Sequence, residues 1–488
     1  MNIWIVWLLF LAVSIILLVL TDVLKKRSQQ RLLGIITLVP LLASSALTFL
    51  LPIEYWEIIF LLVGQLFLCA IVFRLLLSSR LRGPHSTAKD AGQLGLIMAV
   101  SVGFVFLPQE ILLGVLLATI FIVVVAMALQ LRDGYHKYLI EKQLPQNIDD
   151  LPTVSVCIPA RNENHALADC LTTVLESDYP KLEVIVLDDC SQDKTSRIIH
   201  SFAHAGVRFV QGEAPSDGWL GRNQAMQVLS KEATGKYLLF MCVDTRLNSN
   251  AISQLVEYAR EKHLSMLSVL PRKDGRFAPD TFLSTLRFFW QLTTPRFVDM
   301  PVTSALWLVQ ARALEKAGGL KQVASHIEPE RTFARIFAAK STYRFLIGGQ
   351  SLGVFYAKKW SSQIETSVRI WYPLLDMQPG RVFLAVFGQY LFTFLPAVIV
   401  VSGIITQHYT WVTLISAIII ALQFIVYAFY VFKTQERGRL LAILCLPIVA
   451  LQETSLIVTS FLQYEFGTVN WKGRNVCYPI LSSRSWRD

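Results

Sequence analysis

The chain has 488 residues, of which 53% are hydrophobic and only 16% are charged, and its formal net charge is +10. Soluble domains carry about 25% charged residues, so this composition excludes an ordinary soluble protein of that length. The apolar residues are gathered in long blocks, which is typical of an integral membrane protein. Lys and Arg lie mostly beside those blocks and form no basic stripe with interleaved aromatic residues, so no nucleic-acid partner is expected.

Eight apolar segments are predicted to be membrane helices, because a helix needs about 20 residues to cross a bilayer. Five precede residue 133 and three follow residue 375, and they cover residues 3–20, 32–51, 58–77, 94–107, 111–131, 382–405, 411–432 and 440–462. Segment 94–107 is short for a crossing. The first segment has no basic residue before it and no A-x-A-like site after it, so a cleavable signal is not expected.

Basic loops orient these segments. Lys and Arg cluster at residues 25–31 and 80–89, whereas the loops after the second and fourth segments carry neither. By the positive-inside rule, the amino terminus is expected outside the cell membrane and the region 133–375 in the cytosol. We therefore predict a bundle of about five membrane helices at 1–132, a cytosolic domain at 133–375, and membrane helices with a basic tail at 376–488.

The last apolar segment is predicted to be re-entrant or interfacial. Pro447, Gln452 and Glu453 lie in its middle, and a polar group at membrane depth must face protein or water. A full crossing would also place the basic residues of 471–474 outside, against the charge rule.

Between residues 151 and 375, short β-branched runs alternate with helical patterns. This alternation predicts an α/β domain with a mostly parallel sheet and helices on both faces, inserted between the two groups of membrane helices. The expected strands are 154–158, 182–187, 207–211, 237–243 and 266–270, and the expected helices are 166–177, 223–231 and 250–262.

Charged or turn-forming residues follow these strands, and they are Pro159, Arg161, Glu163, Asp188, Asp189, Asp217, Arg222 and Asp244. Because the carboxyl ends of parallel strands meet at one edge, we expect these residues to lie together where open α/β sheets bind nucleotides. An Asp after a strand is more often a cap or turn former. Four such elements at one edge favour a binding site.

The residue types indicate how a nucleotide would be held. Asp188 and Asp189 suit the N–H of a base and the hydroxyls of a ribose, and Arg222 suits the diphosphate. Asp244 suits a divalent metal, Mg²⁺ or Mn²⁺, that bridges the phosphates. The chain has no G-x-G-x-x-G and no P-loop, which disfavours a dinucleotide or ATP-hydrolase site.

Five motifs resemble those of the family 2 inverting glycosyltransferases of GT-A fold. They are PARNE (159–163), DDCSQDKT (188–195), GWLGRNQA (218–225), MCVDTRL (241–247) and AGGL (317–320). The tail VNWKGR (469–474) narrows the resemblance to the membrane subgroup that contains the 4,4′-diaponeurosporenoate and hopene-associated glycosyltransferases. The resemblance covers about residues 154–372 and the tail. It implies a nucleotide-sugar donor, expected to be a UDP-sugar.

Two positions bear on the chemistry that the resemblance implies. The family's metal motif is usually Asp-x-Asp, and here Cys242 replaces the first Asp; a packing role is favoured, because a thiol is a poor ligand for a hard metal ion. The family's base lies in a Glu-Asp-like pair after the Gly-Gly turn, which implies Glu330, with Glu328 second. His326 is a third candidate, to which the resemblance assigns no such role.

A membrane lipid or isoprenoid is the expected acceptor. Residues 279–294 predict an amphipathic helix in the membrane interface with Trp290 beside its apolar stripe, although a core helix of the domain would show a similar pattern. Arg369 and Trp371 precede the next apolar segment, as in an interface belt.

The sequence thus predicts a membrane glycosyltransferase that moves a sugar from a nucleotide to a lipid with inversion. One alternative is a processive polysaccharide synthase, which the missing Gln-x-x-Arg-Trp motif disfavours. A second is a catalytically silent scaffold with the same fold, which Cys242 leaves open.

Overall fold

The computed structural model of the chain describes residues 3–20, 36–37, 39–44, 109–138, 151–273, 279, 282–294, 300–349 and 352–476. The predicted apolar segments 58–77 and 94–107 lie outside these residues, as does most of 32–51. Packing divides the chain into two units. One comprises Met1–Val123, Trp371–Ile420 and Thr454–Thr468, and the other, called the sheet unit below, comprises Val124–Ile370, Ala421–Glu453 and Val469–Asp488.

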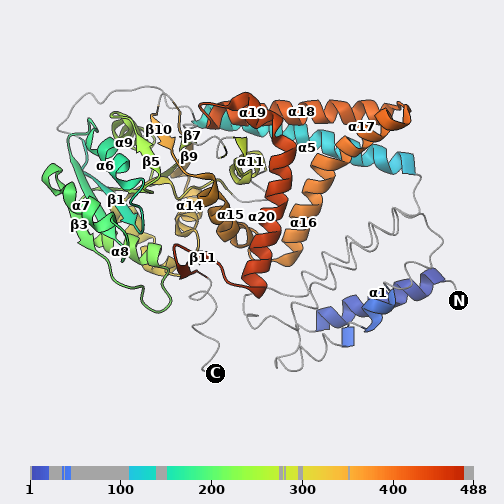
Figure 1. Cartoon of the computed structure of the whole chain (residues 1–488), viewed down its shortest axis with the longest axis horizontal. Coiled ribbons are helices and arrows are strands. Elements are labelled where there is room, and N and C mark those ends of the chain that lie inside the picture. Colours follow the sequence, from blue (N-terminus) through green and yellow to red (C-terminus); the bar gives the residue numbers. More distant parts are fainter. Residues whose placement is uncertain are drawn as a thin grey trace. The chain divides into compact units, whose positions relative to one another are not determined.

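The sheet unit is built on a seven-stranded sheet of order β3-β2-β1-β4-β8-β6-β9 (Figure 1). Its strands are β1 (Val154–Ala160), β2 (Leu182–Asp188), β3 (Val207–Gln211), β4 (Tyr237–Met241), β6 (Met266–Leu270), β8 (Leu306–Gln310) and β9 (Tyr343–Ile347). Neighbouring strands are parallel except where β8 meets β4 and β6. The predicted mostly parallel sheet is confirmed, and the five predicted strands occur close to their expected bounds.

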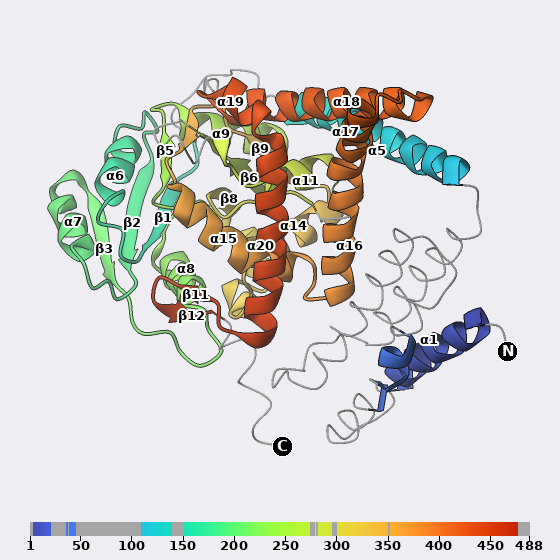
Figure 2. The same ribbon diagram turned by 45° about the vertical axis from the view of Figure 1, so that its right-hand side comes forward.

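Helices cover both faces of this sheet (Figures 1 and 2). Val154, Val156 and Ile158 of β1 belong to the core shared with α6 (Leu167–Leu175) and α9 (Ala251–Glu261). On the other face, Trp307 of β8 stacks on Phe240 and on Phe333 of α14 (Pro329–Ala339). Successive side chains of a strand point to opposite faces, so these strands are buried on both sides, as expected of an α/β domain. The other helices here are α7 (Thr195–Ser201), α8 (Gly221–Glu232) and α13 (Ala311–Lys316).

Two smaller sheets were not predicted. In the first, β10 (Val354–Tyr356) pairs with β5 (Thr245–Leu247) and with β7 (Arg272–Lys273). The second is a hairpin of β11 (Asn470–Trp471) and β12 (Arg474–Asn475). The N–H of Ala357 donates to the carbonyl of Asp244 (2.9 Å), so β10 brings the segment that follows it to the end of β4. Strands of two or three residues are too short to leave a periodic pattern in the sequence.

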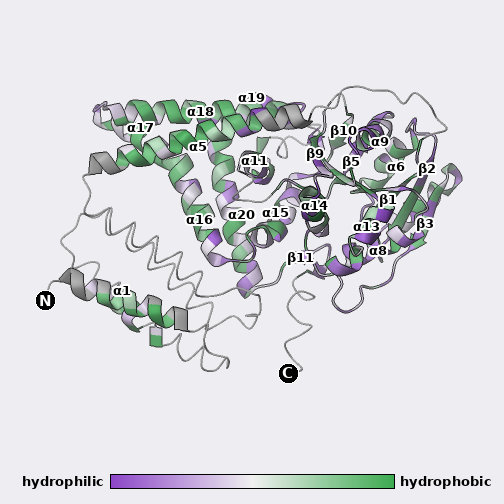
Figure 3. Cartoon of the chain, turned by 180° about the vertical axis from the view of Figure 1, so that it is seen from behind, coloured by the Kyte–Doolittle hydropathy of each residue, from purple (hydrophilic) through white to green (hydrophobic). Residues whose placement is uncertain are grey.

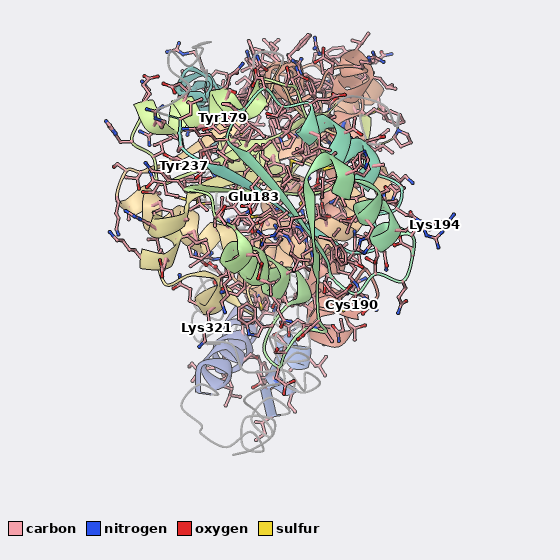
Figure 4. All side chains as sticks on the ribbon, turned by 90° about the vertical axis from the view of Figure 1, so that its left-hand side faces the viewer. Tyr179, Glu183, Cys190, Lys194, Tyr237 and Lys321 are labelled. Carbon is pink, nitrogen blue, oxygen red and sulfur yellow. The ribbon has the colours of Figure 1, made fainter. Side chains whose placement is uncertain are left out.

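Polar contacts join the strands at their amino-terminal ends. Glu183 accepts a hydrogen bond from Ser155 Oγ (2.5 Å) and one from the N–H of Thr234 (3.0 Å), and it pairs with Arg208 (2.9 Å). Figure 4 labels Glu183 near this end of β2 and Cys190 in the loop beyond its other end. The charges at the amino-terminal end thus satisfy one another, whereas the loops at the carboxyl edge carry the predicted site.

Among the described residues, four helices are long and apolar enough to cross a membrane, and they are Leu113–Arg132, Pro379–Thr406, Trp411–Thr434 and Leu446–Phe466. They precede and follow the sheet in the chain, as predicted. The first lies within α5 (Gln109–Tyr138), and the second joins α16 (Pro379–Gln389) to α17 (Leu395–Thr406) through a π-helical turn at Tyr390–Phe394. Pro396 has no N–H with which to continue α-helical bonding, which accounts for that turn. Helices α5, α17 and α18 (Trp411–Thr434) are hydrophobic over most of their length (Figure 3). Shorter or less apolar helices are α1 (Ile3–Leu20), α15 (Trp360–Leu374) and α19 (Arg439–Leu444).

The last apolar segment forms a continuous helix, α20 (Leu446–Phe466). Polar side chains near its start face protein, because Glu453 accepts a hydrogen bond from the N–H of Leu286 (2.9 Å) and Gln452 donates one to the carbonyl of Leu283 (3.0 Å). This satisfies the requirement for polar groups at membrane depth. The re-entrant path stays a prediction.

The predicted amphipathic helix at 279–294 is shorter in the structure, where α11 covers Arg287–Thr293. Its buried residues include the apolar Phe289 and also the polar Arg287 and Gln291. A helix lying on a membrane surface keeps its polar face in water. Helix α11 is therefore packed as a core helix of the sheet unit, the alternative that the pattern left open.

Candidate functional site

At the carboxyl edge of the sheet, side chains of the sheet unit enclose a hollow of about 250 Å³, called the edge hollow below. Its charged lining residues are Arg161, Glu163, His165, Asp189, Arg222, Asp244, Lys358, Glu365, Arg369 and Lys472. Among the residues predicted to bind a nucleotide or metal, Pro159, Arg161, Glu163, Asp189, Arg222 and Asp244 line it. Carboxylates and cations in one hollow suit a ligand that carries both hydrogen-bond donors and phosphates.

The two acids that end β2 have different surroundings. Asp188 is 2% exposed and does not line the edge hollow; its carboxylate accepts hydrogen bonds from the N–H of Ser191 (3.0 Å) and from Ser196 Oγ. Asp189 lines the hollow and pairs with Arg474 (2.6 Å). Burial raises the pKa of Asp189 although Arg474 acts against the rise. In this structure Asp188 holds the loop together and Asp189 faces the ligand space.

The carboxyl-terminal hairpin supplies a side of the hollow that sequence reasoning missed. Lys472 Nζ donates to the carbonyl of Arg161 (2.9 Å) and pairs with the carboxylate of Glu163. The guanidinium of Arg369 lies 4.8 Å from the ring centre of Trp471. The motif VNWKGR could have indicated this element, because it places a Trp and two cationic residues in a polar tail. Such side chains usually have partners in the fold.

Helix α8 begins beside Arg474 of the hairpin. A Cβ on Gly221 would collide with the guanidinium of Arg474 and would lie 2.9 Å from a carboxylate oxygen of Asp189. A side chain at this position would therefore require the ends of Arg474 and Asp189 to shift. The next residue, Arg222, lines the edge hollow from the first turn of α8.

Three side chains form a cluster that can hold a metal ion. The ligand atoms of Glu163, His165 and Asp244 all lie within 4.8 Å of one another. Burial raises the pKa of Glu163, and Lys472 acts against the rise. Two carboxylates and an imidazole fit a divalent ion such as Mn²⁺. Only Asp244 was predicted as a ligand; the loop after β1 joins it because β1 and β4 are neighbours in the sheet.

Cys242 lies outside that cluster. Its thiol donates to the carbonyl of Ser304 (3.1 Å), and burial raises its pKa. A thiol that stays protonated is a poor metal ligand, which agrees with the packing role favoured from the sequence.

The acids near the start of α14 also differ in their partners. Glu328 pairs with Arg287 (2.9 Å) and with Arg331 (2.5 Å). Burial acts to raise the pKa of Glu328, but Arg331 and Arg287 hold it below its ordinary value. Glu330 is fully buried, and one of its oxygens lies 3.3 Å from Arg222. Its other oxygen, Oε1, has no hydrogen-bond partner among the described residues.

Some predicted residues do not meet at the hollow. Asp217 is exposed in the loop before α8, and the lining residues include neither the predicted bases Glu330 and Glu328 nor Trp290 and Trp371. Arg369 does line it. Lys358 and Tyr356 line it as well, and they were missed because the strand that positions them is only three residues long.

Residues 155–303 match the model of the Glycosyl transferase family 2. This segment is a family 2 glycosyltransferase domain. It contains the edge-hollow residues of β1, β2, α8 and β4, and it confirms the resemblance seen in the motifs.

Individual relatives are similar over part of their length. The 4,4'-diaponeurosporenoate glycosyltransferase of Staphylococcus haemolyticus (strain JCSC1435) is 29% identical over 149 residues, which cover 29% of this chain and 39% of the relative. The poly-beta-1,6-N-acetyl-D-glucosamine synthase of Staphylococcus epidermidis is 26% identical over 140 residues, or 28% of this chain and 32% of the relative. In both, this chain spans less than half of the relative's length. A solved mannosyltransferase of Pyrobaculum calidifontis, in complex with GDP-Man and Mn²⁺, covers 73% of this chain and 98% of its own at 16% identity and a TM-score of 0.44.

Proposed function

We propose that the chain is a membrane glycosyltransferase that transfers a sugar from a nucleotide sugar, expected to be a UDP-sugar, to a membrane lipid or isoprenoid with inversion. The observation that carries this proposal is the convergence of Asp189, Arg222 and Asp244 on one hollow inside a family 2 segment. The edge of the sheet where they meet is the edge at which open α/β sheets bind nucleotides.

The donor would lie in the edge hollow. Asp189 would accept a hydrogen bond from the base or the ribose, in place of the one that Arg474 gives it here. Lys472 and Arg369 stand on the same wall and would meet the diphosphate, since guanidinium and ammonium groups are the usual partners of phosphate. Without donor, Lys472 pairs with Glu163 and Arg474 pairs with Asp189. These carboxylates neutralise the two cations until a phosphate of the donor competes for them.

A divalent metal, Mg²⁺ or Mn²⁺, would be held by Asp244, Glu163 and His165, whose ligand atoms are already grouped. When bound, it would supply positive charge for the departing diphosphate. Cys242 takes no part in this set.

Glu330 would act as the base that deprotonates the acceptor hydroxyl while its oxygen attacks the anomeric carbon. Arg222 holds one carboxylate oxygen, and Oε1 has no hydrogen bond among the described residues. Glu330 also lies in the first turn of α14. Attack from the face opposite the diphosphate, with one carboxylate as base, inverts the anomeric centre. Glu328 is a weaker candidate because both its oxygens are held by arginines.

Calorimetry on the purified full chain tests the donor site. Asp244→Asn should abolish the Mn²⁺-dependent part of UDP-sugar binding, because a lost carboxylate removes a metal ligand. Asp169→Asn, the same change on the exposed side of α6, should bind the donor as the unchanged chain does. Equal donor affinity in both variants would remove Asp244 from the site.

The products decide between this function and a processive synthase. Membranes with and without the chain should differ by a lipid that carries a single sugar, as judged by mass. A ladder of sugars would favour the processive alternative, and no change with any nucleotide sugar would favour the silent scaffold.

We also propose that the region 133–375 faces the cytosol. Glu213→Cys, placed in an exposed loop, should react with a membrane-impermeant maleimide only after cells are opened. The chain without this substitution serves as control for its own cysteines. Labelling of the new cysteine in intact cells would show that this region faces the outside of the cell.

A further inference from the structure

A second hollow, of about 60 Å³, lies in the sheet unit beside the edge hollow. Its lining contains Lys273, Arg287 and Lys358 together with hydroxyl groups of Ser and Thr, and none of its described lining residues is Asp or Glu. The edge hollow, by contrast, has Glu163, Asp189, Asp244 and Glu365 among its cations. The two spaces therefore suit ligands of different charge.

Two cations of the second hollow, Arg287 and Lys358, differ in their partners. Arg287 pairs with Glu328, a carboxylate that also pairs with Arg331. Lys358 donates to Thr366 Oγ1 (2.5 Å), and no carboxylate of the described residues lies within 4.0 Å of its Nζ. Asp244 acts on this partly buried ammonium from beyond that distance, and an anion in the second hollow would stabilise it further.

The second hollow is continuous in its lining with the edge hollow. Ser304, Tyr356, Lys358 and Thr366 line both. A group held in the second hollow therefore lies next to a donor sugar held in the first. At about 60 Å³ the second hollow has room for a small head group and not for a nucleotide.

Apolar and helical elements form the rest of its wall. Phe288 comes from α11, and Tyr430 and Thr434 come from the last turns of α18, a helix apolar enough to cross a membrane. An anionic group in this hollow would thus sit at the end of a membrane helix, which is where the head group of a lipid lies.

We propose that the second hollow binds the anionic part, a phosphate or a carboxylate, of an acceptor lipid whose head group also carries the hydroxyl that receives the sugar. Lys273, Arg287 and Lys358 hold the anion. The hydroxyl then enters the edge hollow and gives up its proton as the sugar–diphosphate bond breaks and the new glycosidic bond forms. This inference rests on the proposed function, because it names the acceptor class of that same site.

Vesicles of defined composition test it with the full chain. Phosphatidylcholine vesicles carry one of four additions: phosphatidylglycerol (anion and hydroxyl), phosphatidic acid (anion only), a hydroxy fatty acid (carboxylate and hydroxyl) or diacylglycerol (hydroxyl only). The anionic lipids should bind about ten- to a hundredfold more tightly than diacylglycerol, the usual effect of a charge-assisted hydrogen bond. Sugar should be transferred only to the anionic lipids that have a hydroxyl. A comparison of phosphatidylglycerol with the hydroxy fatty acid then shows whether the hollow recognises a phosphate or a carboxylate.

Lys273→Gln is the matched variant, because Lys273 lines only the second hollow. It should lose most of the preference for anionic lipid and keep the affinity for nucleotide. Lys359→Gln removes the same charge from an exposed neighbouring position and should keep the preference, which excludes a general attraction of a basic protein to anionic vesicles.

Equal binding of diacylglycerol and phosphatidylglycerol would overturn the inference, as would an intact preference in both Lys273→Gln and Lys358→Gln. Nucleotide affinity shows in each case that a variant is folded. Donor turnover without anion preference would defeat this inference alone, whereas anion preference without any nucleotide binding would defeat the proposed function and leave the anion site standing.

Discussion

Two pairs of acids lie near the edge hollow, and each pair divides in the same way. After β2, Asp188 is occupied by the N–H and hydroxyl groups of its own loop, whereas Asp189 faces the hollow. At the start of α14, Glu328 is occupied by two arginines, whereas Glu330 keeps an oxygen without a hydrogen bond among the described residues. In each pair, the scaffold thus engages one acid fully and leaves part of the other acid's carboxylate for further contacts.

The two pairs differ in the groups that bind the carboxylate of the acid held by the scaffold, Asp188 or Glu328. Local backbone and hydroxyl donors hold Asp188, so its role depends on residues within one loop. Arginines from α11 and α14 hold Glu328, so its role depends on two elements that are distant in the sequence. Loss of the second kind of contact should therefore disturb more of the fold.

Glu330→Gln should show the largest effect. The amide keeps the shape and removes the basicity, so turnover should fall by about 10²–10⁴-fold, the usual contribution of a general base, while donor affinity changes by no more than a few-fold. Single-turnover kinetics with a radiolabelled donor measures the turnover, and calorimetry measures the donor affinity. Unchanged turnover would place the base elsewhere.

Glu328→Gln should mainly affect stability. Removal of one partner from a buried charged network costs about 3–5 kcal/mol, because the arginines stay buried without their acid. Thermal unfolding of the purified chain should show a lower midpoint for Glu328→Gln than for Glu330→Gln. A stable Glu328→Gln variant without turnover would instead make Glu328 the base.

The pH dependence of that stability has a defined sign. The folded-state pKa of Glu328 lies below its ordinary value of 4.5, so its contribution is fully present above that value and is lost as the pH falls through the lower folded-state pKa. Acid unfolding below about pH 4.5 should therefore be less steep in Glu328→Gln than in the unchanged chain. Equal steepness would mean that Glu328 is not ionised in the fold.

Asp189→Asn should weaken donor binding by about 1–3 kcal/mol, the cost of leaving one buried donor group unmatched, and should leave the thermal midpoint nearly unchanged. Asp188→Asn should lower the thermal midpoint and leave donor binding nearly unchanged, because the carboxylate of Asp188 holds its own loop. Paired calorimetry and thermal unfolding on both variants separate the two roles. A larger loss of donor affinity in Asp188→Asn than in Asp189→Asn would mean that Asp188 binds the donor and Asp189 stabilises the loop.

Cys242→Asp should have the smallest effect. It places a third acid next to the metal cluster, so activity with Mg²⁺ should be kept or raised if the thiol only packs against Ser304. Initial rates over a range of Mg²⁺ concentrations provide the measurement. Activity that arises only in Cys242→Asp would show that the natural chain is the silent scaffold.

Local patterns determined much of this protein. Short β-branched runs are strands wherever a sheet buries both of their faces, so the parallel strands and the acids that end them were predictable, as were the long apolar segments. The resemblance to the family's motif after the Gly-Gly turn also implied Glu330 and Glu328 without the fold.

Only the tertiary structure decided which acid faces the ligand and what completes the hollow. Lys472 and Arg474 reach Glu163 and Asp189 across some three hundred residues, and His165 joins Asp244 only because β1 and β4 are neighbours. The polar side of α11 looked solvent-exposed in the sequence, yet Arg287 is buried against Glu328. A sequence pattern reports the preference of each segment, whereas the partner of a charged side chain depends on which segments the fold brings together.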